Sequence, residues 1–86
     1  MSLKKRLSHD IFHARTDDRK LTQQQAADAV FISLREYQKI EKGDILPGTE
    51  IFLRLVYFFD LDIKDYLEEA NAHVSIRSFW RISLFP

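Results

Sequence analysis

The chain has 86 residues, the size of one small domain, and 45% of them are apolar, which is typical of a protein with a packed core. It contains no cysteine, which excludes disulfide bonds, cysteine-based zinc sites and thiol catalysis. The longest purely apolar run, Leu55–Phe59, is far shorter than the roughly 20 residues of a membrane-spanning helix, and Met1–Arg6 lacks the apolar stretch of a signal peptide. We therefore expect a soluble, cytoplasmic protein without a membrane partner.

Basic and acidic side chains are equal in number, at 13 each, but they are unevenly distributed. Residues 1–42 hold nine lysines and arginines against six acidic residues, whereas residues 43–69 hold two against seven. The zero net charge argues against a uniformly basic nucleic-acid binder. The asymmetry nevertheless predicts positive potential in the N-terminal half of the molecule.

Two helices are predicted in the first thirty residues. Apolar side chains at i, i+4 spacing predict a helix over residues 2–16 with Ser2 as its N-cap, and the polar segment Thr16–Lys20 predicts a loop. Thr22 followed three residues later by Gln25 is a capping-box pattern. It predicts a second helix through residue 30, with small residues facing inward, namely Ala26, Ala27 and Val30.

A third helix is predicted over Leu34–Lys42. It follows a second capping-box pattern, Ser33 with Glu36, and it precedes Gly43, a residue that readily takes the left-handed backbone found at helix ends. A turn around Pro47 then separates this helix from the next.

Two further helices complete the predicted all-α domain of residues 1–72. The fourth has a strongly apolar stripe made of Ile51, Phe52, Leu55, Val56, Phe58 and Phe59. The fifth is capped by Asp62 and carries an inward stripe of Ile63, Tyr66 and Leu67.

The C-terminal tail, residues 73–86, has the alternating pattern of a β-strand. One face of this strand carries Val74, Ile76, Trp80, Ile82 and Leu84. Because no other segment is predicted to be a strand, its backbone needs a partner from elsewhere. We expect a two-fold homodimer in which two tails pair antiparallel. Irregular packing of the tail on its own helices, or contact with a partner protein, are the alternatives.

Two capped helices joined by a three-residue turn, the first with small inward residues, are the ingredients of a helix-turn-helix. The sequence Leu21-Thr-Gln-Gln-Gln-Ala-Ala27, then Val30-Phe-Ile-Ser33, then Tyr37-Gln-Lys-Ile-Glu-Lys-Gly43 and Pro47 resembles the lambda-repressor-like (XRE/Cro-type) family of bacterial and phage regulators. The resemblance covers about residues 3–68. It departs from the family pattern at Phe31, where many members carry glycine because a left-handed backbone is favourable only without a Cβ.

The resemblance implies a five-helix DNA-binding domain and a sequence-specific transcriptional regulator, typically a repressor, that reads the major groove with helix 34–42. It also implies a structural ion pair between Arg15 and Glu41. The residues that it assigns to DNA contact are Gln23, Ser33, Leu34, Arg35, Gln38, Lys39 and Lys42. Arginine and lysine suit guanine, glutamine suits adenine and leucine suits the thymine methyl group.

Enzymatic chemistry finds no support in the sequence, and we expect no cofactor and no metal. His9 and His13 share a helical face, but no third ligand lies at a suitable spacing. The acidic run after residue 60 lacks the order of a calcium loop, and two glycines cannot build a phosphate-binding loop. The alternative function is a protein-interaction module such as an antitoxin or adaptor, which the zero net charge, the acidic second half and the apolar tail favour.

Overall fold

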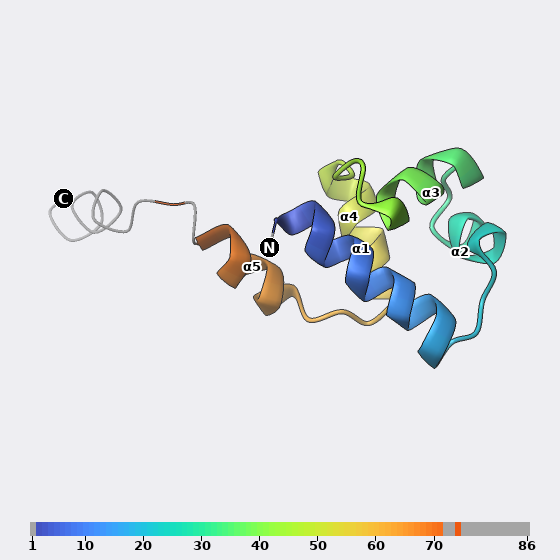
Figure 1. Ribbon diagram of the computed structural model, residues 1–86, viewed down its shortest axis with the longest axis horizontal. Helices are drawn as coiled ribbons and strands as arrows, with labels where there is room; N and C mark the ends of the chain where they lie inside the picture. The colour runs from blue at the N-terminus through green and yellow to red at the C-terminus, as the bar shows by residue number, and fades with distance from the viewer. Residues whose placement is uncertain (1, 72–73, 75–86) are drawn as a thin grey trace, which may run out of the picture.

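The computed structural model describes residues 2–71 and residue 74. Within these residues the chain is helical and forms no strand, which confirms the all-α class for this part. The helices are α1 (Leu3–His13), η1 (Ala14–Asp18), α2 (Gln23–Ala29), α3 (Leu34–Lys42), α4 (Thr49–Phe58) and α5 (Ile63–Asn71), as Figure 1 shows. The predicted C-terminal strand lies outside the described residues except for Val74, which is exposed.

Side-chain caps begin the first three α-helices where the sequence predicts them. The hydroxyl of Ser2 accepts a hydrogen bond from the Lys5 amide at 3.3 Å. At α2 the capping box is complete, because the Thr22 hydroxyl accepts from the Gln25 amide at 3.0 Å and the Gln25 side chain accepts from the Thr22 amide at 2.9 Å. Such caps satisfy amide groups that have no partner within the helix.

The cap of α3 forms in part, and its end is as predicted. The Ser33 hydroxyl accepts from the Glu36 amide at 3.0 Å, but within the described residues the Glu36 side chain does not return the bond. Gly43 ends α3 with a φ of 84°, and its amide donates to the Ile40 carbonyl. A Cβ on Gly43 would lie 3.2 Å from Cδ of Lys5, so α1 also approaches closely here.

Residues 16–18 are helical, which corrects the first part of the predicted loop over Thr16–Lys20. The backbone instead continues α1 as the π-helical segment η1, in which the Arg19 amide donates to the Ala14 carbonyl at 3.0 Å. Polar side chains support this continuation, since the Thr16 hydroxyl donates to the Phe12 carbonyl at 2.8 Å. Their polarity indicated a loop, but their hydrogen bonds stabilise the helix end.

The hydrophobic core lies between α1, α2, α3 and α4. Its members that are less than 5% exposed are Leu7, Ile11, Ala26, Ala27, Val30, Tyr37, Ile40, Leu55, Phe59 and Tyr66. The two alanines confirm the predicted small face of α2, and their size allows α3 to pack closely against it. Burial on this scale is the main favourable contribution to folding in a cysteine-free domain.

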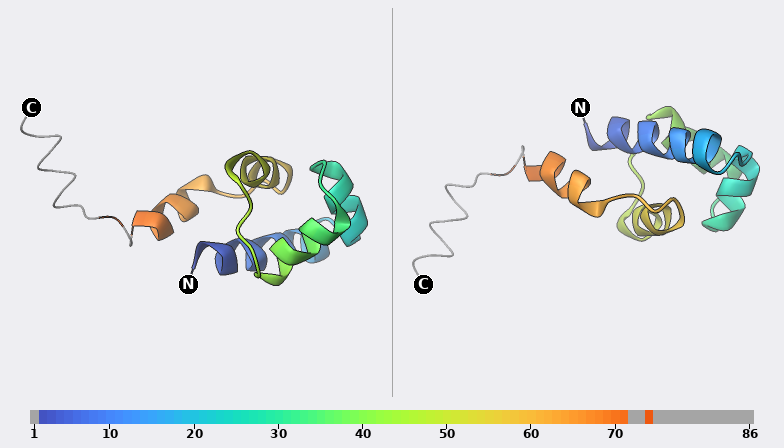
Figure 2. Two further views of the ribbon diagram at one scale, coloured as in Figure 1. Left: turned by 90° about the horizontal axis from the view of Figure 1, so that it is seen from above. Right: turned by 90° about the horizontal axis from the view of Figure 1, so that it is seen from below.

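Helix α5 packs less completely than its sequence predicts. Tyr66 is buried, stacks edge-on against Phe52 at 5.3 Å, and donates a hydrogen bond to the Asp10 carboxylate at 2.5 Å. Ile63 and Leu67 were predicted to face inward, but they are 37% and 62% exposed. The reason is the position of α5, which lies beside the beginning of α1 and at the opposite end of the molecule from α2 in every view (Figures 1 and 2).

The turn between α2 and α3 contains a strained residue at the position where the sequence departs from the family pattern. Phe31 has a φ of 60°, and its side chain is 83% exposed. A non-glycine residue in this conformation costs about 1–2 kcal/mol. Neighbouring hydrogen bonds hold the turn, with the Ile32 amide donating to the Ala27 carbonyl at 3.1 Å and Arg54 donating to the Val30 carbonyl at 3.2 Å.

Candidate nucleic-acid interface

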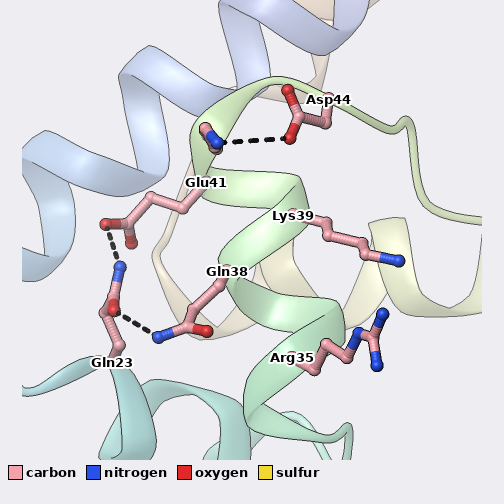
Figure 3. A pocket seen from close by; sticks show the side chains of 7 residues that line it. Gln23, Arg35, Gln38, Lys39, Glu41 and Asp44 are labelled. Atoms are coloured by element: carbon pink, nitrogen blue, oxygen red, sulfur yellow. Dashed lines mark hydrogen bonds and ion pairs between the residues drawn. The ribbon is translucent and has the colours of Figure 1, made fainter.

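Helix α3 has one exposed polar face and one buried face. The exposed face carries side chains at i, i+3, i+4 and i+7 spacing, namely Arg35, Gln38, Lys39 and Lys42. The opposite face is buried and consists of Tyr37, Ile40 and Glu41. Figure 3 shows Arg35 and Lys39 pointing to the same side of α3, while Gln38 points toward Gln23 on α2. Three cationic groups therefore lie along one side of a helix whose other side is anchored in the core.

A shallow open hollow of about 550 Å³ lies along this face. Five of its lining residues were predicted to contact DNA, and they are Gln23, Arg35, Gln38, Lys39 and Lys42. Glu41 and Asp44 complete the lining. The carboxylate of Asp44 lies 4.0 Å from Nζ of Lys42. Asp44 was not predicted as a site residue, although its place directly after Gly43 indicated that it would lie near the last turn of α3.

Two predicted contact residues lie apart from this hollow. Ser33 is exposed, and its hydroxyl caps α3. Leu34 was predicted at an exposed reading position, but it is half-buried at the first position of α3. Partial burial of this leucine is favourable because it removes apolar surface from water.

Arg15 and Glu41 form the ion pair that the family resemblance implies. Nε of Arg15 donates to Oε2 of Glu41 at 2.8 Å, and Nη2 donates to Oε1 at 2.7 Å, so the pair is bidentate. The remaining Nη1 group donates to the Leu21 carbonyl at 2.8 Å. Glu41 is only 8% exposed. Arg15 therefore joins η1 to α3 and to the segment that precedes α2.

The Glu41 carboxylate also accepts hydrogen bonds from Tyr37 at 2.5 Å and from Nε2 of Gln23 at 3.1 Å. Burial disfavours the charged carboxylate, but the hydrogen bonds from Arg15, Tyr37 and Gln23 outweigh it and lower the pKa of Glu41. Burial raises the pKa of Tyr37, and so does its bond to Glu41. The bond to Glu41 raises the pKa of Arg15. Glu41 therefore stays ionised in the folded protein at neutral pH.

Gln23, which was predicted to contact DNA, makes two hydrogen bonds within the chain. Its Nε2 donates to Glu41, and its Oε1 accepts from Nε2 of Gln38 at 3.1 Å (Figure 3). Gln23 therefore links the buried Glu41 carboxylate to the exposed side chain of Gln38. This chain of contacts joins α2 to α3, and no local spacing in the sequence indicated it.

Gln38 keeps hydrogen-bonding groups for an external partner. One N–H of its amide is used by Gln23. The second N–H and the amide oxygen make no hydrogen bond within residues 2–71. One donor and one acceptor on the same amide are what bidentate pairing with adenine needs.

The two histidines that share a face of α1 have carboxylate neighbours of their own. His13 lies 2.8 Å from Asp17, and His9 lies 3.4 Å from Asp10. The bond with His13 lowers the pKa of Asp17. In the part of the chain that the structure describes, no group of three metal-ligating side chains comes together. In the same part, no helix has the length and apolar character needed to cross a membrane.

A comparison of the chain with protein-family models, with curated proteins and with solved structures found no match. The function proposed below therefore depends on the side chains of α2 and α3 and on their chemistry.

Proposed function

We propose that this protein is a sequence-specific DNA-binding regulator of the lambda-repressor-like type, acting as a repressor, which reads the major groove with α3. The observation that carries this proposal is the exposed face of α3, on which Arg35, Gln38 and Lys39 lie together while the opposite face is fixed by the Arg15–Glu41 pair. An α-helix fits the major groove, which is about 12 Å wide.

Each exposed side chain of α3 suits a particular contact. Arg35 lies in the first turn, and the N-terminal residues of a recognition helix are those that reach base edges. We assign Arg35 to guanine, with its donors on O6 and N7, and Gln38 to adenine. Lys42 lies in the last turn, where it suits a phosphate.

Rigidity of α3 supports the proposal because discrimination between bases requires a defined side-chain position. The Arg15–Glu41 pair and the buried Tyr37 hold the helix, and Gln23 orients Gln38. A pre-positioned amide loses less conformational entropy on binding than a free one. Readers of this kind generally bind as two-fold dimers with recognition helices about 34 Å apart, so we propose two copies on each operator.

A second candidate function is a module that holds another protein, such as an antitoxin or adaptor. The observation that favours it is the exposed apolar surface of α4, on which Leu53 is 52% and Tyr57 is 89% exposed. Contiguous apolar surface is a frequent mark of protein interaction sites. This candidate and DNA binding are compatible within one chain, so the decisive experiment concerns DNA.

The experiment selects preferred duplexes from a random pool with the full chain and then measures binding by fluorescence anisotropy. Arg35→Ala is expected to weaken binding to the selected duplex by roughly 5- to 150-fold, the equivalent of about 1–3 kcal/mol, and to relax the preference at one base pair. Lys64→Ala is the matched control, because it removes one exposed positive charge from α5. Failure to select any sequence, or equal effects of the two substitutions, would refute the proposal.

A further inference from the structure

An apolar groove of about 240 Å³ lies at the α5 end of the molecule, away from α2 and α3. Helix α5 lines it along its whole length through residues at i, i+3, i+4 and i+7 spacing, namely Ile63, Tyr66, Leu67 and Ala70. Leu3 at the beginning of α1 and Leu46 before α4 form other parts of the wall. This groove is separate from the polar hollow on α3, and its occupant does not depend on the proposed function.

The groove leaves large apolar side chains in contact with water. Leu46 is 48% exposed and Leu67 is 62% exposed, although both lie beside well-buried core residues. On the described residues, α5 is held mainly by Tyr66 and by the Arg6–Asp65 ion pair at 3.3 Å. Burial of exposed leucine surface is favourable by about 25 cal/mol per Å², so a segment that covered this groove would stabilise α5.

The chain itself supplies a suitable segment directly after α5. At this point the Val74 amide donates a hydrogen bond to the Asn71 carbonyl at 3.1 Å. The residues beyond it are rich in large apolar side chains, namely Ile76, Phe79, Trp80, Ile82, Leu84 and Phe85. Nine helical residues span about 14 Å, a distance that about five extended residues cover. Residues 75–86 are therefore long enough to return along the full length of the groove.

Charge also matches this segment to the α5 wall. Residues 62–71 hold four carboxylates and a single lysine, whereas residues 72–86 hold Arg77 and Arg81 and no acidic residue. The α1 residue that lines the groove, Leu3, is followed in sequence by Lys4 and Lys5, so the two arginines are expected on the α5 side of the groove. Opposite charges at the rim of an apolar contact favour one orientation over others.

We propose that residues 75–86 of the same chain occupy this groove antiparallel to α5, with the Trp80 ring buried between its apolar walls. This differs from the pairing of two tails that the sequence predicts, which becomes the principal competing outcome. An intramolecular segment has a high effective concentration at its site, so the contact needs only modest intrinsic affinity.

Trp80 is the only tryptophan of the chain, so its emission and its quenching by acrylamide report directly on the tail. In the full chain we expect blue-shifted emission and protection from acrylamide. Leu67→Lys, which places a charge in the groove, is expected to shift the emission to longer wavelength and to raise the quenching constant several-fold. Leu53→Lys is the matched control, since Leu53 is a similarly exposed leucine on α4 outside this groove, and it is expected to leave both signals unchanged.

Leu46→Lys alters the groove from a different segment and is expected to act like Leu67→Lys, while far-UV circular dichroism confirms that the helices persist. Emission of the full chain is expected to stay constant on dilution from tens of micromolar to below one micromolar. Free quenching of Trp80 in the unmodified chain would overturn the proposal, as would equal effects of Leu67→Lys and Leu53→Lys. Protection that is lost on dilution together with a fall in solution mass would overturn it in favour of pairing between two chains.

Discussion

Replacement of Glu41 by glutamine tests whether the buried ion pair fixes α3. The substitution keeps the size of the side chain but removes its charge, and the amide nitrogen would face a guanidinium that can only donate. Of the two Arg15 hydrogen bonds, at 2.8 and 2.7 Å, one loses its acceptor and the other is left with a neutral oxygen, while the bond to the Leu21 carbonyl remains. Hydrogen bonds to charged groups contribute about 1.5–3 kcal/mol each, and breaking a buried pair costs about 3–5 kcal/mol.

We therefore expect Glu41→Gln to lower the free energy of unfolding by about 2–4 kcal/mol. At about 0.05–0.15 kcal/mol per residue, the whole domain has roughly 4–13 kcal/mol, so the loss is a large fraction of it. Urea unfolding followed by circular dichroism at neutral pH measures this difference. The double variant with Arg15→Met is expected to show a coupling energy of about 1–3 kcal/mol.

The pH dependence of this difference has a definite sign. The native pKa of Glu41 is lowered, so its carboxylate stabilises the folded state at pH values above its ordinary pKa of 4.5. That contribution decreases as the pH falls below 4.5 and through the lowered native pKa. The difference in free energy of unfolding between the original chain and Glu41→Gln should therefore be largest at pH 7 and should decrease in acid. A gap that is small at pH 7, or equal at pH 7 and pH 3, would refute the reasoning.

Three further predictions concern the turn, the helix end and DNA affinity. Phe31→Gly relieves the strain of a φ of 60° at a residue whose side chain is 83% exposed. It is expected to raise the free energy of unfolding by about 0.5–1 kcal/mol, measured by thermal unfolding. A decrease would show that the ring packs against the rest of the protein. Gly43→Ala adds a Cβ to a residue with a φ of 84°, only 3.2 Å from Cδ of Lys5. It is expected to lower the free energy of urea unfolding by about 1–2 kcal/mol. An unchanged urea midpoint would show that the backbone at this position is not strained. Each of two copies on a duplex is expected to contact about four phosphates through groups such as Lys4, Lys20 and Lys42. The logarithm of the binding constant should then fall with the logarithm of the salt concentration at a slope near −7, measured by anisotropy titrations. A binding constant that does not change with salt would exclude phosphate contacts.

Local sequence patterns predicted the helix boundaries well because caps act over three or four residues. Thr22 with Gln25 and Gly43 are such signals, and the hydrogen bonds that they predict are present. The extension of this helix to Asp18 was missed, since polar composition does not reveal that Thr16 bonds back to the Phe12 carbonyl. Polarity alone does not separate a loop from a solvated helix end.

Tertiary features were predictable only where a family resemblance supplied them. Arg15 and Glu41 are 26 positions apart, and no spacing rule joins them. The contact between Gln23 and Gln38 depends on the relative positions of α2 and α3, which periodicity does not fix. Periodicity also placed Ile63 and Leu67 inward, because it identifies an apolar stripe but not the surface that covers it.

The separation of charge along the molecule bears on how a chain of zero net charge would select its DNA. Helix α3, which carries the cationic side chains, lies beside α2, whereas the acidic helix α5 lies at the opposite end of the molecule from α2 (Figure 1). Such a molecule is oriented by a phosphate backbone without being strongly attracted to it overall. Non-specific affinity depends on phosphate neutralisation, so the acidic end keeps that contribution small. Discrimination would then depend on the contacts of Arg35 and Gln38 with base edges, which makes the fixed position of α3 the property that the Arg15–Glu41 pair most directly serves.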